Sequence, residues 1–301
     1  GQVNLVADRI IGINGNQPGQ FQSPRDVAIA PDGTLYVADS GNHRIQHIAL
    51  DDQGGFKVLK TWGSFGEGAN VPGGIFNEPW GIAVGPDGSV YVADTWNHRI
   101  QKFTKDGDFL LVWGYFGQAE KPEAFWGPRD VAVDALGRVF VTDTGNKRVV
   151  VFNPDGQYIT EFGSYGMAAG QFDENVGIAV DAKERVYVAD TWNQRLQAFA
   201  EQGQNNFIYI KSWDIAGWYG QSLDNKPYVT VDEEGHVLVS DPEGYRVIEF
   251  TAEGQFMRFW GDYSTGPDGF GVVNGLAADM HGGVWVCDAG NHRLLHFILP
   301  K

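Results

Sequence analysis

The chain has 301 residues, of which 43% are hydrophobic and 13% aromatic, and this is enough to bury a large core. Its 22 basic and 38 acidic residues give a formal net charge of −16, which opposes nucleic-acid binding because phosphate recognition needs an excess of Lys and Arg. No long uninterrupted apolar run occurs, so we expect no membrane-inserted segment.

The N-terminal segment has neither a starting Met nor a basic stretch followed by an apolar block. We therefore interpret the chain as a fragment or processed product of a larger polypeptide. The single cysteine, Cys287, excludes an internal disulfide and a cysteine metal cluster, and we expect it to be a small core residue.

One short motif recurs along the whole chain at intervals of about fifty residues. Its six copies are VADSGNHRI (37–45), VADTWNHRI (92–100), VTDTGNKRV (141–149), VADTWNQRL (188–196), VSDPEGYRV (239–247) and VCDAGNHRL (286–294). No linker interrupts the series, so we predict a single domain over residues 1–301.

Each repeat contains four short strands separated by turns. In the second repeat, apolar residues 81–85 precede a Pro-Asp-Gly turn, and alternating residues 89–94 lead through a tight loop to residues 99–103 and then 108–114. Six such units predict an all-β, six-bladed β-propeller with four antiparallel strands per blade, because a closed ring leaves no blade with a bare face.

The two ends of the chain predict how the ring closes. The sixth repeat lacks a fourth strand, whereas the first residues of the chain read as a lone strand before the first repeat. We therefore expect residues 3–11 to pair with residues 293–299 and complete the last blade.

The repeats resemble NHL repeats, as seen in full in FNEPWGIAVGPDGSVYVADTWNHRIQKF at 76–103, where Asn97-His98-Arg99 is close to the triplet that names the family. The fifth copy departs most, with Pro-Glu-Gly at 242–244. The resemblance implies a six-bladed propeller that is mostly a binding platform, and a minority of the family are zinc-dependent lyases. It also favours a bacterial, extracytoplasmic domain at the cell surface or in the periplasm, attached to a larger membrane protein.

An Asp and an Arg recur in every copy, and we assign them to blade architecture because a catalytic site is built only once. The Asp can accept backbone N–H bonds of the tight loop, the Asn can cap that loop in a left-handed conformation, and the Arg can bind carboxylate or carbonyl groups. This structural network comprises Asp39, Asp94, Asp143, Asp190, Asp241 and Asp288 with Arg44, Arg99, Arg148, Arg195, Arg246 and Arg293.

Two copies carry a tryptophan in the tight loop, Trp96 and Trp192, where four carry Gly or Glu. Each ring either packs on a neighbouring long loop or forms an aromatic platform for a ligand.

The long loops between blades bring further aromatic residues to the same face. The regularly placed ones, such as Phe65, Tyr115, Tyr165 and Tyr263, are expected to pack between blades. Trp126, Trp218 and Tyr219 break that register and are expected to be exposed. Acidic residues, including Glu78, Asp173 and Glu174, accompany them.

The residues that begin the innermost strands differ from blade to blade. Pro-Arg-Asp occurs only in the first and third blades, and its Arg and Asp either pair with other loops or line a polar channel mouth that binds a ligand. The mouth candidates are Arg25, Asp26, Trp80, Arg129, Asp130, Tyr228 and Asn274.

These observations favour a non-catalytic recognition domain, monomeric by itself, that binds a carbohydrate or a peptide around the channel. A protein-docking scaffold without a small ligand and a channel-mouth lyase or hydrolase are the alternatives. We expect no catalytic residue, metal or cofactor, because no mouth position is His and no Gly-x-Ser-x-Gly motif occurs. For the enzyme alternative, Asp26 and Asp130 are the candidate pair of carboxyl groups, expected to face each other across the channel.

Overall fold

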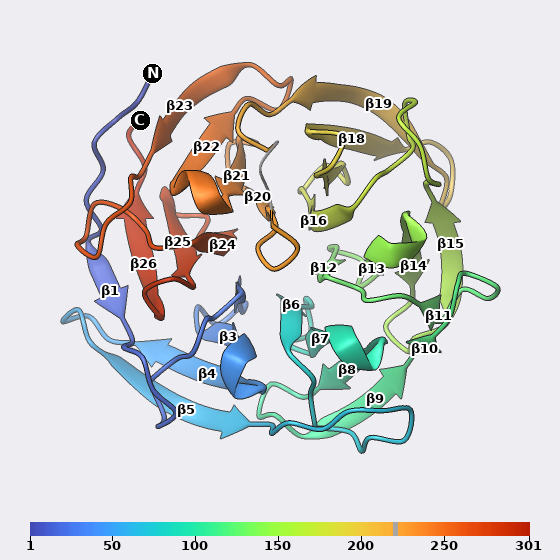
Figure 1. Ribbon diagram of the computed structural model, residues 1–301, viewed down its shortest axis with the longest axis horizontal. Coiled ribbons are helices and arrows are strands. Elements are labelled where there is room, and N and C mark those ends of the chain that lie inside the picture. Colours follow the sequence, from blue (N-terminus) through green and yellow to red (C-terminus); the bar gives the residue numbers. More distant parts are fainter. Residues whose placement is uncertain (219–221) are drawn as a thin grey trace.

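The structure, a computed structural model, describes residues 1–218 and 222–301, and six four-stranded antiparallel sheets follow one another around a ring (Figure 1). This confirms the predicted all-β, six-bladed propeller. In blades one to five the strands run outward from the centre in chain order, and in blade six the N-terminal β1 is the outermost strand. The innermost strands of neighbouring blades contact one another. Among the described residues, no helix is long and apolar enough to cross a bilayer.

The first three blades use consecutive strands. Blade one contains β2 (Asp26–Ile29), β3 (Leu35–Asp39), β4 (Arg44–Leu50) and β5 (Phe56–Trp62). Blade two contains β6 (Pro79–Val84), β7 (Val90–Asp94), β8 (Arg99–Phe103) and β9 (Phe109–Trp113). Blade three contains β12 (Asp130–Val133), β13 (Val139–Asp143), β14 (Arg148–Phe152) and β15 (Tyr158–Phe162).

The last three blades continue the pattern. Blade four contains β16 (Asn175–Val180), β17 (Val186–Asp190), β18 (Arg195–Glu201) and β19 (Phe207–Asp214). Blade five contains β20 (Val229–Val231), β21 (Val237–Asp241), β22 (Arg246–Phe250) and β23 (Phe256–Trp260). Blade six contains β24 (Val273–Ala278), β25 (Gly283–Asp288), β26 (Arg293–Ile298) and β1 (Arg9–Ile11).

The ring closes through β1, which pairs antiparallel with β26 from Arg9 opposite His296 to Ile11 opposite Leu294. The predicted closure is therefore confirmed, but over a shorter stretch than residues 3–11. The residues before β1 cross to blade five instead, where Gln2 forms a parallel bridge with Phe259 in β23.

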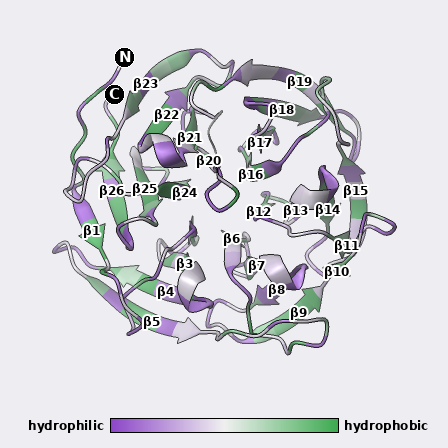
Figure 2. Ribbon diagram, in the orientation of Figure 1, coloured by the Kyte–Doolittle hydropathy of each residue, from purple (hydrophilic) through white to green (hydrophobic). Residues whose placement is uncertain are grey.

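The hydrophobic core is divided among the spaces between neighbouring blades. Buried side chains of blades three and four, for example, form one cluster that includes Phe140, Phe172 and Val188. Figure 2 shows hydrophobic residues along the strands of every blade. Because each sheet packs on both faces, the second and third strands are buried almost throughout.

The tight loops end in a left-handed residue, and this differs from the prediction. Four of them form 3-10 turns, η1 (Ser40–Asn42), η2 (Thr95–Asn97), η3 (Thr144–Asn146) and η4 (Pro242–Gly244). In η2 the residue with positive φ is not Asn97 but the next one, His98, with φ of 55°. Its Nδ1 accepts a hydrogen bond of 2.9 Å from the backbone N–H of Gly127 in the loop before blade three. The side chain therefore anchors the strained residue to the next blade.

A buried phenylalanine anchors the long loop before every blade except blade five. Phe125 in the short strand β11 (Ala124–Phe125) lies under Gly114, where a Cβ would come within 2.5 Å of its ring. The parallel partner of β11 is β10 (Tyr115–Phe116), whose side chains are exposed. The prediction that the regularly placed aromatic residues pack between blades is therefore wrong. All four are exposed, namely Phe65, Tyr115, Tyr165 and Tyr263, and the later phenylalanine of the loop fills the core.

Candidate functional site

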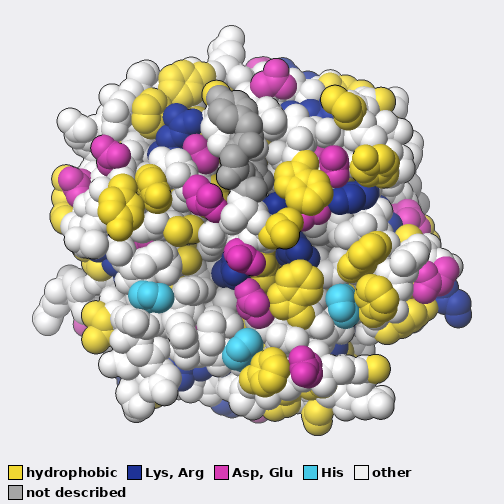
Figure 3. All heavy atoms as spheres, viewed as in Figure 1, with side chains coloured by type: hydrophobic (Ala, Val, Ile, Leu, Met, Phe, Trp, Pro, Cys, Tyr) yellow, Lys and Arg dark blue, Asp and Glu magenta, His cyan; other side chains and the backbone are white. Residues whose placement is uncertain are grey.

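The mouth of the central channel lies on the face that carries the 3-10 turns. In an antiparallel pair the start of one strand and the end of the next lie at the same edge, so the residues that begin the innermost strands gather beside these turns. Figure 3 shows aromatic, basic and acidic side chains together around the centre of this face.

Large side chains and glycines alternate around the channel just below the mouth. A Cβ on Gly81 would lie 2.6 Å from the Cα of Asp130, so every second blade must leave room for its neighbour. The six positions, from blade one to blade six, are Asp26, Gly81, Asp130, Gly177, Tyr228 and Gly275.

Tyr228 spans the channel. It begins the inner strand of blade five, and its buried hydroxyl donates a hydrogen bond to the backbone carbonyl of Trp80 in blade two, on the opposite side of the ring. Burial and the neighbouring Asp26 and Asp130 raise the pKa of the Tyr228 hydroxyl. The phenol therefore stays protonated and keeps donating this bond.

Asp26 and Asp130 are buried beside Tyr228 and interact directly with each other. Asp26 accepts the backbone N–H of Ile82 at 3.0 Å, and Asp130 accepts that of Ile178 at 3.0 Å, so each carboxyl group joins its own blade to the next. Burial raises the pKa of Asp130 to about 8, and burial together with Asp130 raises that of Asp26 well above its ordinary value. The pair therefore retains at least one proton at neutral pH.

Above this layer, two guanidinium groups contact tryptophan rings. Arg25 lies 3.8 Å from the centroid of Trp80, and Arg129 lies 4.8 Å from Trp80 and 4.4 Å from Trp96. The two rings meet edge to face at 6.5 Å. Arg25 is neutralised by Glu78 at 2.8 Å. Trp80 is buried, whereas 36% of Trp96 is exposed.

A second group of cations surrounds Trp192, of which 43% is exposed. Lys147 and Lys226 lie 5.1 and 4.7 Å from the centroid of its ring. Glu174 serves both, at 3.1 Å from Lys147 and 3.7 Å from Lys226. Burial lowers the pKa of Lys226, whose side chain is fully enclosed.

A line of aromatic rings runs outward from the mouth over blades two and three. We call Trp96, His98, Phe116 and Trp126 the aromatic ridge. Its successive ring centroids lie 6.5, 4.9 and 6.0 Å apart. Pockets for small ligands commonly measure about 300–1,000 Å³. The groove beside the ridge, partly lined by Trp96 and Phe116, measures about 650 Å³. Trp126 is 42% exposed, and its ring packs over Gly145.

Comparison with known proteins identifies the first four repeats. A family profile described as "NHL repeat" matches residues 21–48, 76–103, 125–152 and 176–199. The chain carries NHL repeats. Blades five and six lie outside these matches, and blade five is the copy whose tight loop departs most from the others.

Curated relatives of this NHL-repeat chain match it over part of their length. It is 32% identical over 111 residues to NHL repeat-containing protein 3 of Homo sapiens, and the match spans 36% of this chain and 30% of that protein. A probable peptidyl-alpha-hydroxyglycine alpha-amidating lyase of Caenorhabditis elegans is 30% identical over 111 residues, with the same two shares.

Among solved structures, a gluconolactonase from Xanthomonas campestris superposes with a TM-score of 0.64 at 18% identity. The superposition covers 99% of this chain and 98% of that chain, and it shows a shared fold. A lyase and a lactonase thus stand among the proteins that this chain resembles. The comparisons do not support the expectation that the NHL-repeat chain has no catalytic site.

The structure separates the predicted site residues into three groups. Trp96, Trp126 and Trp192 are partly exposed on the mouth face, and the seven mouth candidates surround the channel. Trp218 was expected to be exposed, and this is wrong: only 1% of it is exposed, because it fills the core between blades four and five and donates from Nε1 to the Ser240 carbonyl. Tyr219 lies outside the described residues.

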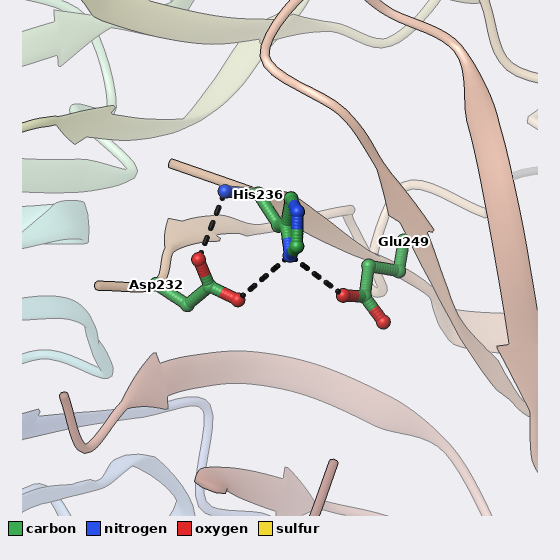
Figure 4. A group of neighbouring side chains, drawn as sticks. All are labelled: Asp232, His236 and Glu249. Carbon is green, nitrogen blue, oxygen red and sulfur yellow. Dashed lines mark hydrogen bonds and ion pairs between the residues drawn. The ribbon is translucent and has the colours of Figure 1, made fainter. Parts of the chain in front are cut away.

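One ionisable cluster was missed by sequence reasoning, because Glu249 in β22 comes beside Asp232 and His236 of the β20–β21 turn only through the pairing of β21 with β22. His236 Nδ1 lies 3.3 Å from carboxylate oxygens of both Asp232 and Glu249 (Figure 4). The three side chains have metal-ligand chemistry. However, Glu249 also binds Arg258 at 2.6 Å, and Asp232 accepts the backbone N–H of His236, so the cluster is already satisfied as an ion-pair network.

Proposed function

We propose that the chain is a recognition domain that binds an oligosaccharide on its mouth face, along the aromatic ridge. The observation that carries this proposal is the unbroken series of rings from Trp96 to Trp126 beside a groove of 650 Å³. Exposed aromatic rings supply rigid contact area at a small entropic cost. The C–H face of a sugar ring packs on such rings, while its hydroxyl groups reach the polar groups at the groove edge.

Neighbouring structure supports a ligand that extends from the channel outward. Trp96 belongs to the ridge and also contacts Arg129 at the mouth, so the two features form one continuous surface. The buried channel layer of Tyr228, Asp26 and Asp130 blocks deeper entry. The ligand therefore lies across the face rather than threading the ring.

A glycan panel and isothermal titration test this proposal. Trp96→Ala and Trp126→Ala should each weaken binding of a captured glycan about 10-fold or more, the scale of losing one aromatic anchor, with the melting temperature nearly unchanged. Phe65→Ala is the matched control, because Phe65 is exposed and sits 4.9 Å from His43 much as Phe116 sits from His98. Capture of peptides or a protein instead of glycans would favour the docking scaffold.

A lyase or lactone hydrolase acting at the mouth is the second candidate, favoured by the relative and the structural neighbour that bear such names. Of the described residues, no three histidines converge there: His43, His98 and His292 each bind the backbone of the next blade through Nδ1. Turnover of a lactone or a glycan by the wild type, lost in Arg129→Gln, would favour catalysis over recognition alone.

A further inference from the structure

Arg129 differs from the other cations at the mouth. Arg25, Lys147 and Lys226 each have a carboxylate within 4 Å, whereas within the described part of the chain no carboxylate lies that close to Arg129. In the part of the chain that the structure describes, Nη1 of Arg129 donates to the carbonyl of Gly127, and the buried Nε has no acceptor. Only 8% of the residue is exposed.

Such a guanidinium is costly, because a cation removed from water needs a counter-charge or a full set of acceptors. The rings of Trp80 and Trp96 offset part of this cost through cation–π contact. Burial lowers the pKa of Arg129 even though Glu78 and Glu174 act to raise it. With no carboxylate of the described residues within ion-pair distance, the side chain has room for a further negative group.

We propose that Arg129 binds a carboxylate group at the end of the ligand, so that the oligosaccharide taken up along the aromatic ridge carries a sugar acid at its inner end. This inference rests on the proposed function. The guanidinium fork matches the two oxygens of a carboxylate, which is planar and carries a single charge. Glu78 and Glu174 act on Arg129 and would oppose a dianion more strongly than a single carboxylate.

The position of Trp96 sets how the acid sits. Its ring contacts Arg129 on one side and leads to His98 and the ridge on the other. A sugar ring stacked on Trp96 therefore places a substituent carboxylate at Arg129. Asn274, which is fully buried with both side-chain heteroatoms unpartnered, adds polar groups to the channel wall at the equivalent position of blade six.

Matched probes separate the carboxylate from the rest of the ligand. We would titrate a glucuronate-terminated oligosaccharide and its glucose-terminated counterpart, together with an acetylated dipeptide in its free-acid and amide forms. For the wild type the acidic oligosaccharide should bind about 10-fold tighter or more than the neutral one, the scale of a charge-assisted hydrogen bond. Arg129→Gln should remove this preference, and Arg129→Lys should keep only part of it.

Stability measurements show whether Arg129 has a structural role instead of a ligand-binding one. Without ligand, Arg129→Gln should melt at or above the wild-type temperature, because it removes an uncompensated buried cation. Lys60→Gln, an exposed single-charge change on β5, should leave the preference unchanged. A markedly lower melting temperature for Arg129→Gln, or an equal preference in that variant, would overturn the carboxylate site.

The remaining outcomes separate the two proposals. Equal binding of both oligosaccharides by the wild type would leave the recognition function standing and overturn the carboxylate site. Binding of only the free-acid dipeptide, dependent on Arg129, would support the carboxylate site and overturn the sugar. Binding of none of the four probes would count against both.

Discussion

The repeated Asp of each blade is the centre of a small hydrogen-bonded unit. Asp94 accepts the backbone N–H of Asn77 on Oδ1, and on Oδ2 it accepts Asn97, Arg99 and Gln101. Arg99 then donates to carbonyl groups of the loop before the blade. The assignment of this Asp and Arg to blade architecture rests on these bonds.

Blade five provides a natural comparison for the energy of this unit. Asp241 keeps the bond to Arg246, but Gly244 and Ile248 stand at the positions of the Asn and Gln donors. Asp94→Ala leaves Arg99 buried without its partner and should lower the free energy of unfolding by about 3 kcal/mol or more, whereas Asp241→Ala should cost only about 1–2 kcal/mol. Denaturant titration measures both. Equal losses would show that the extra donors contribute nothing.

The carboxyl pair in the channel predicts a pH dependence of stability. In the unfolded chain Asp ionises near pH 4, whereas in the folded state the pKa of Asp130 is about 8 and that of Asp26 is also raised. The folded state therefore keeps protons that the unfolded state has released, and the stabilisation is lost as pH rises from about 4 through about 8.

Thermal melts at intervals of about one pH unit from pH 5 to pH 9 test this loss of stability. Asp130→Asn, which cannot ionise, should show a flatter decline of melting temperature than the wild type. Asp155→Asn, in an exposed turn of blade three, is the control and should follow the wild type. An unchanged slope in Asp130→Asn would mean that the pair is ionised in the folded protein.

At the level of elements, β1 carries the closure of the ring. Removing residues 1–12 should leave the outer edge of β26 unpaired and lower the melting temperature, with aggregation through the bare edge. Removing residues 1–7 keeps β1 but loses the bonds to Phe259 and Pro267 and the packing of residues 3, 5 and 7 on the core, so its effect should be smaller than that of removing 1–12. Size-exclusion chromatography and thermal melts compare the two. Equal behaviour of both truncations as stable monomers would contradict the closure role.

The loops before the blades show why the sequence can predict an element correctly and still mispredict which of its side chains are buried. Four of these loops hold two such aromatic positions, as Tyr115 and Phe125 do before blade three. Spacing alone does not tell which one is buried. The ring of Phe125 in β11 is buried because Gly114, just before β10, has no Cβ and lets the ring approach. The contact forms only when β10 and β11 pair.

Across the whole molecule there is an excess of negative charge, −16 in total, yet among the described residues no carboxylate pairs with the buried Arg129. Charges on the rim are separated from the mouth by side chains and solvent, and screening limits their reach to about 10 Å. The balance at the mouth is therefore set by Glu78 and Glu174, which engage other cations. Net charge accordingly says little about which ligand the mouth accepts.

The sequence by itself determined the features that repeat. Six copies of one motif are enough to define the number of blades, the strand order within each blade and the closing role of β1. The reason is that every repeat buries the same faces against its two neighbours. The Asp–Arg network belongs here too, since its partners lie within one repeat and the loop before it.

Only the tertiary structure decided the features that occur once. Asp26, Asp130 and Tyr228 meet in the channel although 202 positions separate the first from the last. Among the described residues Arg129 has no carboxylate partner, because Glu78 pairs with Arg25 and Glu174 with Lys147 and Lys226. Trp218 is buried where its spacing suggested exposure. Each of these outcomes depends on neighbours from other blades, and the distances between blades are set by ring closure rather than by any local pattern.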